Sequence, residues 1–255
     1  MPLLTGPGES QGWQAQAQAA IWAYARVPVD PGWRTAAVNW DGTQVVADVG
    51  CGSAPDLRRL VAAGACRRAI GLDKYSVPVP ARPLVRADAR RLPLRDGSVD
   101  VAMALHVLHL VGDAHCAVRE LRRVVRPGGT MLASADGGES LAEIYQLFAD
   151  VIADQLGHAV TVTPASHFTL ETGRMMLETE FSRVDLSELH VPLSFPSERP
   201  LVAYLDSIRQ PILSRVGEHF DYGAALDDFG VRVGRVTQAH GYFRATSRSG
   251  VFACR

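Results

Sequence analysis

The sequence predicts an α/β protein built on a doubly wound, mostly parallel sheet. Three observations support this: a strand, glycine turn and helix follow one another at residues 45–64, apolar strands and amphipathic helices then alternate to about residue 156, and acidic residues stand where three early strands end. This alternation is typical of parallel sheets with helices on both faces, and ligands bind there at the carboxyl ends of the strands.

The first strand and its turn are the centre of this prediction. Val45–Val49 is apolar except for Asp48, which predicts a buried parallel strand. Gly50 and Gly52 follow, and the absence of a Cβ at both positions would let a ligand approach the backbone closely. Cys51, between them, is expected to be a small space-filling residue and not a nucleophile.

A helix is expected directly after the turn. Ser53 is a suitable N-cap, Pro55 suits the first turn, and Asp56 stands where the acid of a capping box would be. Gly64 then ends the helix.

The next expected elements complete the first half of the sheet. Proline-rich residues 75–83 interrupt the alternation. The expected strands are 68–73, 84–88, 99–105 and 130–135, and the expected helices are 116–125 and 140–156.

The C-terminal half is expected to add a helix, a strand, a helical insertion and two closing strands. These are a helix at 170–180, a strand at 182–193, helices near 198–216 and 222–236, and a hairpin of 242–246 with 250–254. We therefore expect an N-terminal helical lid (1–42), a core (43–194), a helical cap insertion (195–240) and closing strands of the core, one of them antiparallel (241–255).

A helix is expected near the N-terminus, over residues 11–26. Trp13, Ala17, Ile21 and Tyr24 would share one face of it. Two interpretations stay open, a helix that packs on the core and a lid over the strand ends.

Composition limits the classes of protein that fit. With 26 basic and 27 acidic residues, the chain lacks the basic excess of a dedicated nucleic-acid binder. Its four cysteines form no CxxC pair, which favours free thiols in a reducing compartment. No signal-peptide pattern and no apolar run of membrane-spanning length is present, so we expect a cytoplasmic protein that does not enter the membrane.

The glycine turn departs from the dinucleotide pattern G-x-G-x-x-G, because Pro55 stands at the third glycine position. No P-loop lysine follows either. Instead Asp48, Asp73 and Asp88 stand at predicted strand ends. This acidic edge suits a ligand with a cationic group and free hydroxyls better than it suits a pyrophosphate.

Four segments together resemble the class I S-adenosylmethionine-dependent methyltransferases, in the UbiE-like branch that mostly methylates small molecules. The resemblance covers about residues 43–136 and is specific in order and spacing. The segments are Val46-Ala47-Asp48-Val49-Gly50-Cys51-Gly52, Gly71-Leu72-Asp73, residues 87–100 from Ala87-Asp88-Ala89 to Val99-Asp100, and residues 120–129 from Glu120-Leu121 to Pro127-Gly128-Gly129.

The resemblance implies a Rossmann-like fold, S-adenosyl-L-methionine as cofactor, and a role for each matching residue. The turn Gly50-Cys51-Gly52 and the following helix N-terminus would take the carboxylate of the cofactor. Asp48 would act near its amino group, Asp73 would hold the ribose diol, Asp88 and the Ala89 amide would hold adenine, and Leu105 and His106 would line the methyl side. Lys74 follows the ribose acid, and its role stays open.

Methyl transfer from a sulfonium requires mainly in-line placement and exclusion of water. A base is needed only where the acceptor must lose a proton. His106 is the best placed candidate, ahead of His109, His167, His240, Tyr24 and Tyr242. The histidine spacing near residue 106 matches no closed zinc pattern, so no metal is expected.

The expected activity is therefore methyl transfer to a small-molecule acceptor, such as a specialised metabolite. An RNA methyltransferase and a protein that uses the fold without methylating are alternatives. A nicotinamide oxidoreductase is the weakest alternative, because of Pro55 and the acidic edge. The sequence predicts neither the acceptor nor the oligomeric state.

Overall fold

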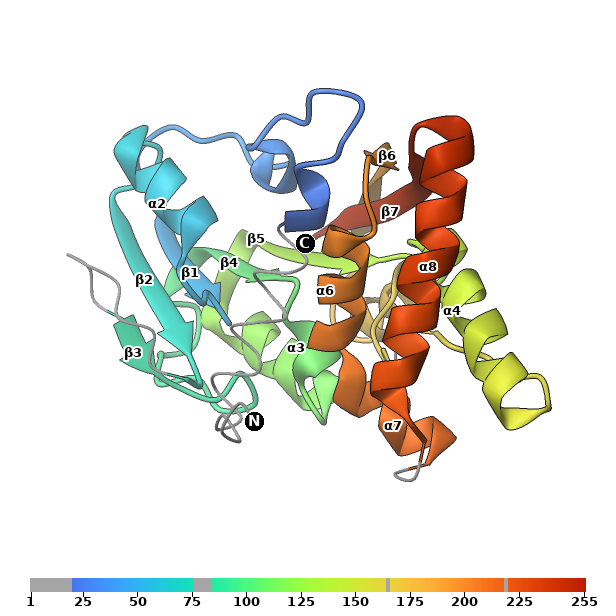
Figure 1. Cartoon of the computed structure of the whole chain (residues 1–255). Helices are drawn as coiled ribbons and strands as arrows, with labels where there is room; N and C mark the ends of the chain where they lie inside the picture. The colour runs from blue at the N-terminus through green and yellow to red at the C-terminus, as the bar shows by residue number, and fades with distance from the viewer. Residues whose placement is uncertain (1–19, 76–83, 164–165, 218–219) are drawn as a thin grey trace. The chain divides into compact units, whose positions relative to one another are not determined.

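The computed structural model describes residues 20–75, 84–163, 166–217 and 220–255 (Figure 1). The chain divides into two compact units. The sheet unit comprises residues 29–138, 166–189 and 249–255, and the helical unit comprises residues 1–28, 139–165 and 190–248.

A seven-stranded sheet has the order β3-β2-β1-β4-β5-β7-β6. Strands β1 to β5 pair in parallel, and β7 pairs antiparallel with β5, so the mostly parallel sheet with an antiparallel closing strand is confirmed (Figure 1). The order reverses between β1 and β4, which is where sheets of this kind bind ligands. The strands are β1 Val45–Val49, β2 Arg68–Asp73, β3 Leu84–Arg86, β4 Val99–Leu105, β5 Val125–Asp136, β6 Val184–Phe195 and β7 Phe243–Cys254.

Alternation along the strands builds a core on each face of the sheet unit. Val46 belongs to a cluster with Leu57 and Leu60, whereas Ala47 belongs to a larger cluster with Val118 and Leu121. Neighbouring strand residues point to opposite faces, so one strand contributes to both clusters. The helices of this unit are the 3₁₀ turns η1 Trp33–Thr35 and η2 Leu108–Leu110, with α2 Pro55–Ala62, α3 Ala114–Val124 and α5 Leu170–Leu177.

The helical unit contains α4 Ala142–Leu156, α6 Arg199–Ser207, α7 Arg209–Val216 and α8 Tyr222–His240. Helix α8 packs against both α4 and α6 (Figure 1). Phe148 of α4 meets the Phe229 ring of α8 edge-on, and the Tyr145 and Tyr204 hydroxyls share a hydrogen bond of 2.5 Å. No helix among the described residues is both long enough and apolar enough to span a membrane.

Several local predictions are corrected by the structure. Helix α2 is capped at Ala54, which has left-handed backbone dihedrals, so Ser53 is not the N-cap and no capping box forms with Asp56. The expected hairpin at 242–254 is one continuous strand, because its second half pairs along β5. Strand β5 begins at Val125, five residues before the expected start.

The structure describes only the end of the expected N-terminal helix, and the two compact units divide the chain at other residues than the predicted domains, which stay predictions. Residues 1–19, which carry most of the expected helix 11–26, lie outside the described residues, and residues 20–22 are helical. Residues 29–42 belong to the sheet unit, whereas residues 139–165 belong to the helical unit. The latter difference has a packing cause, because α4 lies against α8.

Candidate functional site

The glycine turn combines a packed position with an open one. Gly50 has φ +70°, and a Cβ there would stand 2.1 Å from Val107 Cγ2. Gly52 has φ +51°, and a Cβ there would meet nothing within 4 Å among the described residues. Both positions favour glycine for conformation, but only Gly52 leaves room for a ligand.

Asp48 is buried at the carboxyl end of β1, with 4% of its surface exposed. No hydrogen bond from the described part of the chain reaches its carboxyl group. Burial, reinforced by the nearby Asp56 and Asp73 carboxylates, raises its pKa to about 8. A buried carboxyl without a partner is unfavourable to ionise, so this side chain is suited to a cation that arrives with a ligand.

Asp73 ends the neighbouring strand β2, and its carboxylate is held over the glycine turn. One oxygen accepts the Gly52 N–H at 2.8 Å, and the other accepts the Tyr75 N–H at 2.8 Å. Each carboxylate oxygen can accept a second hydrogen bond. The group is therefore preorganised and retains capacity for a pair of hydroxyls.

Asp88 follows β3, and its carboxylate is engaged by basic side chains. Arg90 donates to both oxygens, at 3.0 and 2.8 Å, and Lys74 Nζ lies 3.8 Å away. The Arg90 hydrogen bonds hold the pKa of Asp88 well below its usual range. Lys74 thus has an ion-pair partner in the structure, and the adjacent Ala89 is buried.

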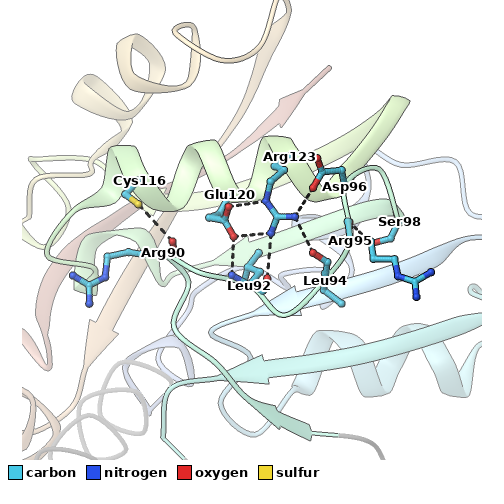
Figure 2. A network of polar contacts seen from close by, with 9 residues as sticks. All are labelled: Arg90, Leu92, Leu94, Arg95, Asp96, Ser98, Cys116, Glu120 and Arg123. Carbon is cyan, nitrogen blue, oxygen red and sulfur yellow. Dashed lines mark hydrogen bonds and ion pairs between the residues drawn. The ribbon is translucent and has the colours of Figure 1, made fainter.

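The loop that carries Asp88 is fastened to α3 by Arg123 (Figure 2). The guanidinium binds both Glu120 oxygens at 2.7 Å, and Glu120 in turn accepts the Leu92 N–H. It also binds Asp96 and donates to the Leu92 and Leu94 carbonyls. The sequence showed Glu120 and Arg123 as part of a motif, and the structure shows that the pair holds this loop.

Leu105 and His106 lie at the carboxyl end of β4, next to β1. His106 has φ +52°, uncommon for a residue with a Cβ, and its N–H donates to the Ser134 hydroxyl at 2.9 Å. Burial lowers the pKa of His106, whereas the Asp136 carboxylate acts to raise it. The imidazole is therefore neutral at pH 7, with one ring nitrogen unprotonated.

Neither His109, three residues further along the chain, nor Cys51 is ionised at neutral pH. Burial lowers the pKa of His109 to about 4. Burial raises the pKa of the Cys51 thiol to about 12, so the nucleophilic thiolate is not populated at neutral pH. Among the described residues, no group of three His, Cys, Asp or Glu side chains is arranged to hold a metal ion.

Sequence reasoning missed a buried ion pair beside the turn. Arg34 of η1 donates from Nε to Asp56 Oδ2 at 3.1 Å, and Asp56 is 6% exposed. Arg59 lies 3.9 Å from the other Asp56 oxygen and donates to Thr35 Oγ1 at 2.6 Å. Arg34 and Asp56 are 22 residues apart, so no local pattern in the sequence indicated the pair.

The helical unit has a surface cavity of about 750 Å³ between α6 and α8. Acidic Glu198 and Asp227 and basic Arg199 and Arg235 line it, over Val202 and other small residues. None of the predicted site residues lines this cavity, including Tyr24, His240 and Tyr242, which belong to the helical unit. The convergence of charged and strained residues at the β1–β4 edge is the stronger sign of a functional site.

Comparison with known proteins shows that part of the sheet unit is similar to methyltransferases. Residues 47–133, about a third of the chain, match the methyltransferase domain family. The malonyl-[acyl-carrier protein] O-methyltransferase of Xylella fastidiosa is 39% identical over 29% of this chain and 25% of its own length. The UbiE ubiquinone/menaquinone C-methyltransferase of Shewanella is 26% identical over 41% of this chain and 47% of its own length. The chain thus spans less than half of the length of these relatives.

Solved structures share the fold over most of the chain. The YcgJ protein of Bacillus subtilis has a TM-score of 0.52 at 14% identity and covers 85% of this chain and 93% of its own. The [4+2]-cyclase SpnF has a TM-score of 0.50 at 15% identity and covers 95% of this chain and 81% of its own. The segment 47–133, which contains the motifs and the site acids, is thus similar to the class I S-adenosylmethionine-dependent methyltransferases of the type 11, UbiE-like family.

Proposed function

We propose that the chain transfers a methyl group from S-adenosylmethionine to a small-molecule acceptor. The observation that carries the proposal is the row of acids at adjacent strand ends, Asp48 without a partner and Asp73 preorganised by Gly52. An ammonium group and a ribose diol are the ligand groups that such acids bind best.

Each site residue has a proposed role in binding one part of S-adenosylmethionine. Asp73 accepts the ribose hydroxyls, and Asp88 with the Ala89 amide binds adenine beside Lys74. Gly50, Cys51 and Gly52 present backbone to the amino-acid end, and Asp48 receives its ammonium. When bound, the cofactor supplies an electrophilic methyl group, and Leu105 and His106 border the place where it lies.

His106 is the proposed general base for acceptors that must lose a proton. Its imidazole is neutral at pH 7 and stands at the end of β4, at the edge where β1 also ends. If His106→Ala retains full turnover with the identified acceptor, the role as a base is wrong. A small-molecule acceptor is favoured over RNA because the chain has a net charge of −1 and no basic excess. The cytoplasmic location stays a prediction.

Two measurements test the proposal. Isothermal titration calorimetry should show S-adenosylmethionine binding to the wild type, with affinity reduced at least tenfold in Asp73→Ala and Asp88→Ala. Unchanged affinity in both variants would contradict the cofactor site.

The second measurement uses methyl-labelled cofactor and a metabolite extract. We expect label in a small-molecule fraction. Label in RNA would show that the acceptor is RNA and not a small molecule. The cyclase that shares this fold shows that fold alone does not assign methyl transfer. Binding with no labelled product would therefore favour a reaction other than methylation.

A further inference from the structure

Arg34 places a positive charge at the edge where β1 and β4 end. It belongs to η1, just before β1, and its side chain is 27% exposed. Its charge acts on two groups at that edge. It opposes the burial that raises the pKa of Asp48, and it adds to the burial that lowers the pKa of His106. Arg34 therefore lies within electrostatic range of both strand ends.

The Arg34 guanidinium is anchored on one side and free on the other. Its Nε donates to the buried Asp56 carboxylate at the start of α2. Within the described part of the chain, neither of its terminal nitrogens has a hydrogen-bond acceptor. An anchored guanidinium with two parallel free N–H groups fits a carboxylate in a bidentate manner.

Arg59 is the other cation near Asp56, but it is committed elsewhere. Its Nη2 donates to the buried Thr35 hydroxyl, and its Nε is buried without a partner. Arg59 thus fastens η1 to α2, whereas both terminal nitrogens of Arg34 remain available to a ligand.

The charges of S-adenosylmethionine indicate which of its groups Arg34 would bind. The methionine end of S-adenosylmethionine carries an ammonium and a carboxylate on one carbon. The unpartnered Asp48 complements the ammonium, and a guanidinium with free N–H groups beside the start of α2 complements the carboxylate. We infer that Arg34 binds the carboxylate of the methionine end through its two terminal nitrogens, while Asp48 binds the ammonium. This inference rests on the proposed function.

Three ligands separate the contribution of each charge. S-adenosylmethionine carries both charges of the amino-acid end, decarboxylated S-adenosylmethionine carries only the ammonium, and 5′-methylthioadenosine carries neither. Calorimetry of the wild type should show the first ligand binding about 10- to 100-fold more tightly than the second. In Arg34→Ala this ratio should fall to within about threefold, with 5′-methylthioadenosine binding unchanged.

Further variants test whether Arg34→Ala weakens binding only by disturbing the local structure. Arg34→Ala leaves Asp56 buried without its closest cation, so Arg34→Ala/Asp56→Asn repeats the test without that unpaired charge. Arg59→Ala should keep the wild-type ratio, and Asp48→Asn should weaken the first two ligands equally.

The outcomes are distinct. An Arg34 variant that weakens the first two ligands equally would overturn the inference, because Arg34 would then only support the turn. A wild type that binds 5′-methylthioadenosine but does not prefer the carboxylate would overturn it while the proposed cofactor site stands. A wild type that binds none of the three would remove the proposed function and this inference together.

Discussion

The β2–β3 and β1–β4 sides of the strand edge differ in how the protein treats its polar groups. On the β2–β3 side, Asp73 accepts two backbone N–H groups, Asp88 is paired with Arg90, and Arg123 fastens the following loop. On the β1–β4 side, Asp48 has no described hydrogen-bond partner and His106 has a strained backbone.

This difference separates residues that stabilise the fold in addition to their proposed role in binding from residues whose polar groups are reserved for a ligand. A satisfied polar network rigidifies its loop, whereas an unsatisfied buried group or a strained residue lowers stability unless a ligand uses it. We therefore expect substitutions on the β2–β3 side to lower stability. Substitutions of Asp48 and His106 on the β1–β4 side should reduce binding or chemistry while stability stays the same or rises.

The two glycines of the turn should give the largest contrast. Gly50→Ala would force a Cβ to 2.1 Å from Val107 at φ +70°, so we expect the free energy of unfolding to fall by about 3 kcal/mol or more. Gly52→Ala has open space, so only the left-handed conformation should cost about 1 kcal/mol. Urea unfolding measures both.

For Gly52→Ala, we expect a small loss of stability but a large loss of affinity for S-adenosylmethionine. The added Cβ would enter the space that we assign to the cofactor, so calorimetry of this folded variant should show S-adenosylmethionine affinity reduced at least tenfold. Equal stability losses in the two variants would contradict the assignment of one packed and one open glycine.

Asp48 should make stability depend on pH in an unusual direction. Its folded-state pKa of about 8 lies above the ordinary value of 3.8, so between these values the folded protein binds the extra proton. The free energy of unfolding should therefore fall as pH rises, by up to about 1.4 kcal/mol per pH unit between pH 5 and pH 7.

Asp48→Asn is the matched variant for this pH dependence. It keeps the size of the side chain and removes the titration, so the difference between wild type and variant should shift in favour of the variant by about 2 to 3 kcal/mol from pH 5 to pH 7. A difference that is the same at both pH values would show that Asp48 titrates normally.

The elements predicted best from the sequence are short and locally determined. The strands 68–73 and 99–105 were predicted with their observed bounds, because an apolar run between turn residues leaves little choice. The acids at the strand ends were found in the same way. The roles assigned to Asp48, Asp73, Asp88 and His106 stay predictions.

Three of the missed features depend on contacts between residues that are distant in sequence. Nothing local indicates that Arg34 pairs with Asp56, or that Arg123 reaches the carbonyls of Leu92 and Leu94 about 30 residues earlier. The continuous β7 was predicted as a hairpin of 242–246 with 250–254, whereas it is one strand whose second half pairs with β5.

Arg123→Ala should remove the clamp on the β2–β3 side. The side chain makes several charge-assisted hydrogen bonds and is 30% exposed, so we expect unfolding to become easier by about 2 kcal/mol. Arg119→Ala, on the same helix but exposed and without described partners, should change stability by less than about 0.5 kcal/mol. Similar losses in both variants would mean that the network contributes nothing specific.

His106→Gly should have the smallest effect on stability, and in the favourable direction. Glycine adopts φ +52° without the cost that a Cβ imposes, so the free energy of unfolding should rise by about 1 kcal/mol relative to His106→Ala, which keeps the strain. Both variants lack the imidazole, so both should lose methyl transfer to an acceptor that requires a base. Stability that increases while turnover falls would show that the strain at the end of β4 is retained for the reaction. Equal stability of the two variants would place the conformational cost elsewhere.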